Sequence, residues 1–450
     1  MGKNKFFIIP AIIFSAVSLM LFSCSGNETP SSSAVISESS AEVSGISEYS
    51  ENTSDGEQSS EITDVRYLSV NLTEPYSFNI EFDSNREFNT VVLNGISENV
   101  VSIEIAVKNT EDEFEKVYFQ SEISQNRICY IGNQSSDTVI IRFVSSGGDV
   151  AIGEIYTEMT DFSNLSLSSY VTVTPSEISK RKDDFSLLSD AVLISGSAKW
   201  DKNGKIVPGE KLSEAINEIP SNQCKVWISI SPQSVLIKNK TAGKTIDSNE
   251  KINALTENIL DFIDSCGGRD IIGIDFDWEF PYDEEWSFFS NLIVSLKNAA
   301  PGLTISAAFY PENIALTDGA VAALDRINVM AYDLFDENGY QSTYLAAQQS
   351  IDYFLALGFS PEQLFLGIPL YGRPVDQSNI WKLYKDTPDG FSDATNLFEN
   401  AYYNGALLIG DKLALANSKN LGGITFFHLF CDFPSSNQRS LIMHAYSILE

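Results

Sequence analysis

The sequence predicts an α/β protein in which a small all-β sandwich of the jelly-roll type precedes a (β/α)8 TIM barrel. Three observations lead to this prediction. From about residue 165 onward, short apolar runs with strand character alternate with segments of helical periodicity. Between residues 65 and 160, strand-like runs recur at close spacing with turn residues between them. The chain has 450 residues, which is long enough for two or three domains.

The barrel prediction, for residues 165–450, depends on eight apolar runs. They lie at residues 170–173, 191–194, 225–230, 271–277, 303–309, 326–331, 364–369 and 423–427. Helical periodicity lies between several of them, as at 252–263 and 286–296. Because active sites of such barrels lie at the C-terminal ends of the strands, functional residues are expected where these runs end.

The sandwich prediction covers residues 65–160. Its strands are expected at residues 88–93, 101–107, 116–119, 127–130, 138–143 and 151–156. Their order resembles that of a galactose-binding-like (discoidin-type) jelly roll. That resemblance leaves two roles open, carbohydrate binding and a structural spacer.

The N-terminus is predicted to direct export. Lys3 and Lys5 precede an apolar run at 6–22, as in a secretory signal, and residues 21–24, Leu-Phe-Ser-Cys, resemble a bacterial lipobox. Residues 1–24 are therefore expected to be a lipoprotein signal peptide with lipidation at Cys24; a plain signal peptide or an anchor helix is the alternative. Residues 25–64, rich in Ser and Glu, are expected to be a disordered linker. The expected location is the outer face of the bacterial cytoplasmic membrane or the cell surface, with the lipid as the sole membrane contact.

Charge and residue usage exclude several function classes. A formal net charge of −32 argues against nucleic acid or an anionic membrane surface as a partner, whereas a neutral glycan is compatible with it. The remaining cysteines have neither Cys-x-x-Cys spacing nor a nearby His cluster, so no metal site is expected. They are expected to be buried free thiols. These cysteines are Cys129, Cys224, Cys266 and Cys431. No Gly-x-Ser-x-Gly motif accompanies either histidine, which argues against a Ser-His-Asp hydrolase.

Residues 271–281, Ile-Ile-Gly-Ile-Asp-Phe-Asp-Trp-Glu-Phe-Pro, carry the clearest functional signal. Side chains alternate between the faces of a strand, so Asp275, Asp277 and Glu279 share one face. Neighbouring carboxylates cannot both ionise cheaply, which raises the pKa of at least one of them. A carboxyl group that stays protonated near neutral pH can act as the acid in glycosidic bond cleavage. The alternative, the polar face of an exposed strand, does not explain why the acids stand at the strand end.

The pattern Asp275-x-Asp277-x-Glu279, preceded by Gly273, resembles the catalytic signature of glycoside hydrolase family 18, the chitinases and their relatives. The family form is Asp-Gly-x-Asp-x-Asp-x-Glu. Ile272 stands here where the first Asp would be.

Two further strand ends carry motifs of the same family. Residues 330–333, Met-Ala-Tyr-Asp, match Met-x-Tyr-Asp, and residues 367–373 resemble Gly-x-Pro-x-Tyr-Gly-Arg. The resemblance implies that Tyr332 holds the acetamido group of the substrate, with Met330 and Asp333 beside it. It also implies that Tyr371 and Arg373 contact sugar hydroxyls. Structural roles at strand ends are the alternative.

Two motif regions depart from the family pattern. Residues 229–232, Ser-Ile-Ser-Pro, stand where the family has Ser-x-Gly-Gly. Ser229 matches and is expected to hydrogen-bond Asp275, whereas Ser231 and Pro232 replace both glycines. At the end of the eighth strand the family places a Trp under the sugar, and this chain has Phe427, whose smaller ring predicts weaker stacking.

The resemblance implies hydrolysis of β-1,4 linkages in N-acetylglucosamine-containing glycans, chitin or chitooligosaccharides, by substrate-assisted retaining catalysis. Glu279 would protonate the leaving oxygen and Asp277 would orient the acetamido group. Asp275 would share a proton with Asp277, and Tyr332 would hold the acetamido oxygen. Trp278 is counted among the substrate-binding residues. No metal or cofactor is required, and a monomer is expected.

Other functions remain open on the sequence. They are hydrolysis of peptidoglycan, an endo-β-N-acetylglucosaminidase activity on N-glycans, and non-catalytic binding as a chitinase-like lectin. The segment between Arg373 and Gly422 is too short for an added α+β domain. A shallow cleft that cuts chains internally is therefore expected.

Overall fold

The structure of the chain is a computed structural model that describes residues 47–49, 66–201, 205–221, 223–231, 249–266, 271–393 and 395–450. The predicted signal peptide, the lipidation site at Cys24 and most of the predicted linker lie outside these ranges, as does Pro232. Within the described ranges, no helix combines the length and apolar character needed to cross a membrane.

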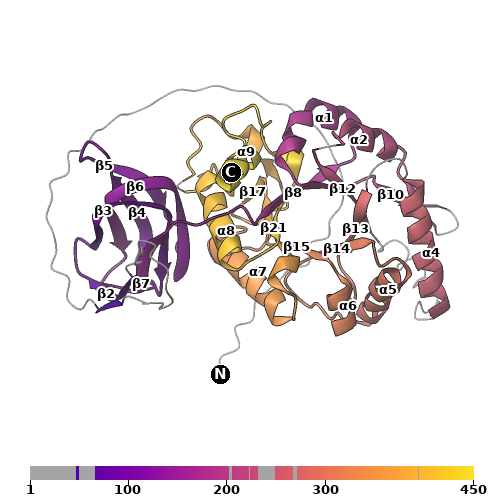
Figure 1. The fold of residues 1–450 in the computed structure, drawn as a ribbon, viewed down its shortest axis with the longest axis horizontal. Coiled ribbons are helices and arrows are strands. Elements are labelled where there is room, and N and C mark those ends of the chain that lie inside the picture. Colours follow the sequence, from indigo (N-terminus) through magenta and orange to yellow (C-terminus); the bar gives the residue numbers. More distant parts are fainter. Residues whose placement is uncertain are drawn as a thin grey trace, which may run out of the picture.

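Eight parallel strands close into a barrel, which confirms the predicted fold (Figure 1). The strands are β8 (Ser166–Thr172), β9 (Asp190–Ile194), β12 (Lys225–Ile230), β13 (Ile271–Asp277), β14 (Thr304–Phe309), β15 (Arg326–Val329), β16 (Leu364–Pro369) and β21 (Gly423–Phe427). Around the barrel they follow chain order, and β21 closes onto β8. The first strand begins earlier than predicted, at Ser166, because serines without an apolar pattern still pair with β21.

Helices cover the outside of the barrel (Figure 1). They are α1 (Pro175–Lys180), α2 (Leu212–Glu218), α4 (Asn249–Ser265), α5 (Trp286–Ala299), α6 (Asp318–Ala323), α7 (Tyr344–Ala356), α8 (Ala406–Ser418) and α9 (Leu441–Leu449). The predictions at 252–263 and 286–296 are confirmed by α4 and α5. Helix α5 buries Trp286, Phe289 and Ile293, whose spacing of three and four places them on one face. That face packs on β13, where Phe289 meets Phe276 with ring centroids 5.2 Å apart.

Shorter strands and 3-10 turns lie in the segments that connect the barrel strands and helices. They are β10 (Ala198–Trp200), β11 (Ile206–Pro208), β17 (Tyr371–Pro374), β18 (Lys382–Leu383), β19 (Leu397–Phe398), β20 (Ala401–Tyr402) and the 3-10 turns η1 (Lys182–Leu187), η2 (Asp283–Glu285), η3 (Pro361–Gln363), η4 (Tyr384–Asp386) and η5 (Leu429–Cys431). Strands β17 to β20 form a small antiparallel sheet between the last two barrel strands. This sheet occupies the segment that the sequence predicts to be too short for an added domain.

The N-terminal part is all β, as predicted, in one antiparallel sheet of seven strands. The strands are β1 (Ser47–Tyr49), β2 (Arg66–Leu72), β3 (Ser77–Asn94), β4 (Val100–Lys108), β5 (Phe114–Gln120), β6 (Asn126–Ser145) and β7 (Val150–Glu158). The runs predicted as separate strands at 127–130 and 138–143 are one long strand, β6. Its pairing with β3 shifts register twice, so both strands can bend around an apolar core. The likeness to galactose-binding jelly rolls stays a prediction, and β1 adds an edge strand inside the segment expected to be a linker.

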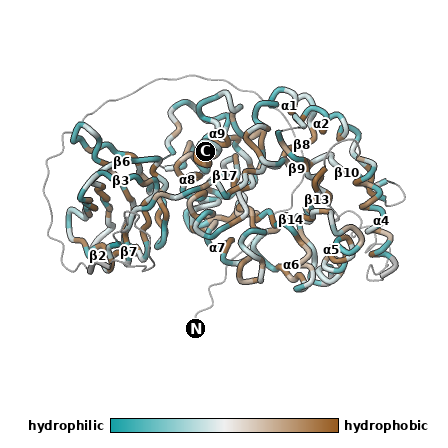
Figure 2. Tube along the Cα trace, viewed as in Figure 1, coloured by the Kyte–Doolittle hydropathy of each residue, from teal (hydrophilic) through white to brown (hydrophobic). Residues whose placement is uncertain are grey.

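Apolar residues follow the strands of both parts. Figure 2 shows hydrophobic stretches along the barrel strands and inside the all-β part, with hydrophilic stretches toward the outside. A large core fills the space between barrel and helices, and a smaller cluster lies inside the barrel mouth. The strands therefore present an apolar face outward and a mixed face inward, which leaves polar side chains for a site.

A buried ion pair joins the all-β part to helix α8. The Arg127 guanidinium on β6 donates to the Asp411 carboxylate at 2.6 Å, and both side chains are fully buried. Tyr118 donates to the same oxygen at 2.7 Å, and the Tyr130 amide donates to the other at 2.8 Å. A Cβ at Gly410 would overlap the Tyr130 ring, so glycine permits this close approach.

We expect Asp411→Asn to lower the free energy of unfolding by about 3 kcal/mol, because the guanidinium of Arg127 would stay buried without its counter-charge. Urea unfolding followed by circular dichroism measures this loss. Asp352→Asn is the matched control, since Asp352 pairs with Lys419 at 2.8 Å near the surface. Breaking a surface pair changes stability by less than about 1 kcal/mol. Equal losses in the two variants would contradict a special role for the buried pair.

Candidate active site

Strand β13 directs its acids and its apolar residues to opposite faces. Ile274, Phe276 and Trp278 are buried in the core between barrel and helices. Asp275 points into the barrel, where it meets residues of other strands. Glycine is required at Gly273, because a Cβ there would overlap the carbonyl oxygen of the neighbouring strand. The face assignment from the sequence is confirmed.

Asp275 is fully buried and surrounded by hydrogen-bond donors. Ser306 on β14 donates at 2.6 Å and Asn328 on β15 at 3.0 Å, both to Oδ1. The Tyr170 hydroxyl on β8 donates to Oδ2 at 3.2 Å. Burial raises the pKa of Asp275, and the hydrogen bonds of Ser306 and Ser229 oppose that shift. Ser229 on β12 is opposite Asp275 in the strand register, where the predicted contact requires it. Ser306, Asn328 and Tyr170 hold the carboxyl group in one orientation.

Asp277 and Glu279 form a coupled pair above Asp275. Burial raises the pKa of Asp277 well above its usual range, and the charges of Glu279 and Asp275 raise it further. Burial also raises the pKa of Glu279, against a hydrogen bond from Asp277 that lowers it. Glu279 is partly exposed, whereas Asp275 is not. The pair can therefore hold a proton near neutral pH at a position that a ligand can reach.

An aromatic group lies near these acids inside the barrel mouth. Tyr332, 6% exposed, follows β15, and burial together with the charge of Glu279 raises the pKa of its hydroxyl. Its ring stacks on Phe427 at the end of β21, with centroids 5.4 Å apart and planes at 27°. Met330 belongs to the same interior cluster. Ile272, in place of the family's first Asp, packs on this cluster too, which fits an apolar residue at that position.

Asp333 is fixed by residues from three strand ends. Arg373 on β17 pairs with its carboxylate at 2.7 Å, and Tyr310 after β14 donates to its carbonyl oxygen at 2.9 Å. Its amide donates to Gln341 at 3.3 Å. Burial raises the pKa of Asp333, and the charge of Arg373 opposes the shift. Tyr371, fully buried next to Asp333, completes the group.

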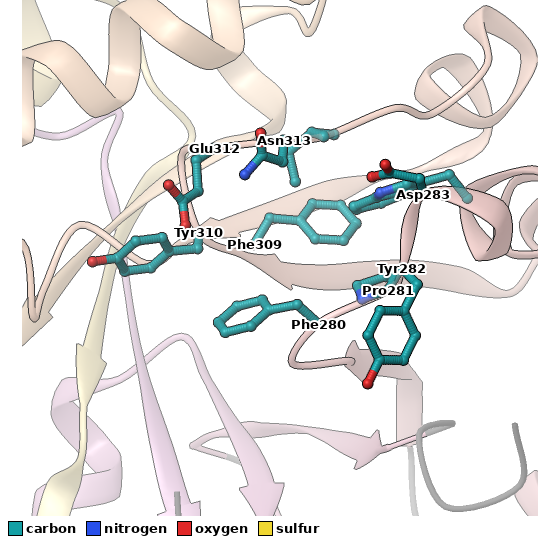
Figure 3. Close-up of a pocket in the computed structure, with 10 residues that line it drawn as sticks. Phe280, Pro281, Tyr282, Asp283, Phe309, Tyr310, Glu312 and Asn313 are labelled. Atoms are coloured by element: carbon teal, nitrogen blue, oxygen red, sulfur yellow. The ribbon is translucent and has the colours of Figure 1, made fainter. Parts of the chain in front are cut away.

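A pocket of about 310 Å³ is lined by the residues that follow Glu279 in the chain, from Phe280 to Asp283, and by residues after β14 (Figure 3). Its aromatic walls include Phe280 and Tyr310, which lie on the same side in Figure 3 with ring centroids 6.0 Å apart. Polar groups on its rim come from Asp283, Glu312 and Asn313. Apolar walls with a few polar groups are typical of a small-ligand pocket.

The structure brings together most of the predicted site residues and corrects one of them. Trp278 is not a substrate-binding residue: it is 1% exposed, and its ring packs on Phe289 at 5.1 Å. It follows β13 directly and points outward into the core between barrel and helices. Sequence reasoning missed Tyr170, Ser306 and Asn328, the donors around Asp275. Polar residues inside otherwise apolar barrel strands were the available signal.

No cluster of His, Cys, Asp or Glu suited to a metal ion occurs among the residues that the structure describes. Cys129, Cys224, Cys266 and Cys431 are buried free thiols, as expected. Burial raises the pKa of Cys129 and Cys431 to about 12, so these thiols stay protonated.

Fold and site together define a (β/α)8 barrel with a pair of coupled carboxyl groups at the open end of its fourth strand. The model of the family "Glycosyl hydrolases family 18" matches residues 117–432. The chain belongs to this glycoside hydrolase family.

Individual proteins show more distant similarity. Over 184 residues the chain is 28% identical to Probable chitinase 10 of Drosophila melanogaster, covering 33% of this chain and 8% of that protein. The GH18 chitinase ChiB of Flavobacterium johnsoniae has a TM-score of 0.55 at 22% identity, covering 63% of this chain and 94% of its own. YKL-39, solved in the presence of chitooligosaccharides, has a TM-score of 0.51 at 18% identity, covering 63% and 99%. At these identities the two structures show a common fold.

Proposed function

We propose that this protein hydrolyses β-1,4 linkages in N-acetylglucosamine-containing glycans, with chitin or chitooligosaccharides as substrate. One observation carries the proposal: Glu279 is partly exposed at the barrel mouth, burial raises its pKa, and it shares a hydrogen bond with Asp277. A protonated carboxyl group in reach of ligand is what a glycosidase acid needs. Membership of family 18 and the similarity to proteins named as chitinases support the substrate class.

The proposed reaction has two steps. In the first, the acetamido carbonyl oxygen of the substrate attacks the anomeric carbon while the glycosidic C–O bond breaks, and the Glu279 proton passes to the leaving oxygen. In the second, water adds to the anomeric carbon, the bond to the acetamido oxygen breaks, and Glu279 takes the proton of the water. The configuration at the anomeric carbon is retained.

The neighbours of Glu279 assist the acetamido group. Asp277 accepts its N–H and balances the positive charge that develops on it. Asp275, buried beneath, exchanges a proton with Asp277 so that one charge is shared between the two carboxyl groups. The Tyr332 hydroxyl donates a hydrogen bond to the acetamido oxygen and positions that oxygen for attack on the anomeric carbon.

The pocket and the short strands β17 to β20 support cleavage inside a glycan chain. The pocket lined by Phe280 and Tyr310 follows Glu279 and offers room for the sugar on the leaving side. Short strands β17 to β20 stand where a larger added domain would deepen the cleft. The shallow cleft expected from the sequence would admit a chain from either side.

Parallel incubation with chitin oligomers, high-mannose N-glycans and peptidoglycan tests the proposal. We expect chitin oligomers to be cleaved fastest, with products of several lengths from a hexamer. Cleavage of another polymer alone would replace the substrate, release of dimers from one end alone would refute internal cleavage, and binding without cleavage would make the protein a lectin.

A further inference from the structure

A tryptophan outside the family motifs lies at the barrel mouth. Trp381 stacks on Tyr371, with ring centroids 4.2 Å apart and planes at 11°. Its indole also meets the ring of Phe427 at 5.6 Å and 83°. Phe427 in turn stacks on Tyr332 at 5.4 Å. Ring by ring, Trp381 is thus connected to the tyrosine that faces Glu279.

The rings of this group differ in exposure. Tyr371 and Tyr332 are 1% and 6% exposed, and Phe427 is partly buried. Trp381 is 40% exposed. The largest aromatic ring of the group is therefore also the one most open to a ligand, and its partners are the support behind it.

The loop that carries Trp381 is held in place. Strand β18 follows the residue directly and pairs with β17. Upstream, the Ser378 carbonyl oxygen accepts hydrogen bonds from the Ile380 amide at 2.8 Å and from Arg373 at 3.3 Å. Arg373 is the residue that pairs with Asp333 in the site. Because the loop is fixed before a ligand arrives, little conformational entropy is lost on binding.

The barrel order decides which sugar Trp381 can reach. β21 lies across the barrel from β13, which carries Glu279, and the pocket beside Phe280 lies on the β13 and β14 side. Trp381, packed on Phe427, stands on the other side of the cleavage point. Because the proposed function places the leaving sugar in that pocket, a sugar over Trp381 is the one that keeps the anomeric carbon under attack.

We propose that Trp381 is the principal sugar-stacking residue of this site, and that it restores the aromatic area missing at Phe427. The proposal rests on the proposed function, since it concerns a substrate of the same reaction. The C–H bonds of an N-acetylglucosamine ring present an apolar face to the negative face of the indole. The platform comes from the loop after the seventh barrel strand, and Phe427 on the eighth supports it.

Calorimetric titration with chitotetraose tests the proposal in the Glu279→Gln background, where turnover does not interfere. We expect Trp381→Ala to raise Kd roughly tenfold and Trp381→Phe to raise it less, because a smaller ring remains. Leu357→Ala is the matched control: Leu357 is 37% exposed at the end of α7, and Kd should stay unchanged. An unchanged Kd for Trp381→Ala would overturn the proposal.

Fluorescence gives a readout that a merely structural role would not move. Trp227, Trp278 and Trp286 are at most 5% exposed. With Trp200, the fifth tryptophan, replaced by Phe in every sample, chitotetraose should shift mainly the emission of Trp381. We expect this shift in Glu279→Gln and its loss when Trp381→Phe is added, with the melting temperature unchanged. A shift that persists would refute stacking on Trp381.

The two proposals fail in different ways. If the wild-type protein cleaves none of the glycans, the proposed function fails. If it cleaves chitotetraose and the Trp381→Ala variant has the wild-type KM, only the stacking role fails. A raised KM with kcat within a few-fold of the wild-type value supports stacking.

Discussion

Glu279→Gln is expected to lower kcat on chitooligosaccharides by about 10³-fold or more while the fold is kept, because the amide cannot donate a proton to the leaving oxygen. Burial raises the pKa of Glu279, which lies two residues beyond the end of β13 and is partly exposed. The shapes of the two side chains are nearly the same, so packing around the site should not change. Product release from chitohexaose, followed by chromatography, measures the loss.

Glu362→Gln is the matched control for this substitution. Glu362 is exposed in η3, at the start of β16 and therefore at the opposite end of the barrel. We expect wild-type turnover in this variant and equal melting temperatures in both. Substantial turnover by Glu279→Gln would remove Glu279 from the role of acid and leave the barrel a binding protein.

Asp277→Asn is expected to have the second-largest effect on catalysis, a loss of roughly 10²- to 10³-fold in kcat. Asp277 lies between Asp275 and Glu279, and burial together with the charges of both neighbours raises its pKa. An amide cannot balance the positive charge that develops on the acetamido group. The same kinetic assay on chitohexaose measures the effect, and retention of more than a tenth of the wild-type kcat would contradict this role.

The same variant should be more stable than the wild type at neutral pH. Burial raises the pKa of Asp277, so between its ordinary and raised values the folded protein binds more protons than the unfolded chain. The free energy of unfolding therefore falls as pH rises through this window. Removing the titrating group removes the penalty. We expect a gain of about 1 kcal/mol or more near pH 7.5 that disappears near pH 3.

Asp137→Asn provides a control of opposite sign. A hydrogen bond from Lys108 lowers the pKa of Asp137, so its contribution to stability is present above the ordinary carboxyl pKa and is lost as pH falls. This variant should be no more stable than the wild type at neutral pH. Thermal melts of both variants across pH decide the matter; a gain for Asp277→Asn that does not depend on pH would argue against the buried carboxylate as its cause.

The barrel could be predicted because its signals are local. Eight apolar runs separated by helical periodicity specify alternating strands and helices whatever their partners are. The all-β part was less predictable. The polar stretch from Gly132 to Ser136 resembles a turn, yet β6 continues through it because β3 offers a bonding partner with shifted register. Pairing between distant strands decided that element, and no single window of sequence contains it.

What the sequence by itself determined is the row of acids: a period of two places Asp275 and Asp277 on one face of β13 wherever that strand lies, and Glu279 follows two residues later. The same alternation sends Trp278 to the opposite face. What only the tertiary structure decided is which side chains surround these acids. Tyr170 meets Asp275 and Trp381 meets Phe427 because barrel closure brings together residues far apart in the chain. Burial by those neighbours, and not residue type, sets the protonation on which the proposed chemistry depends.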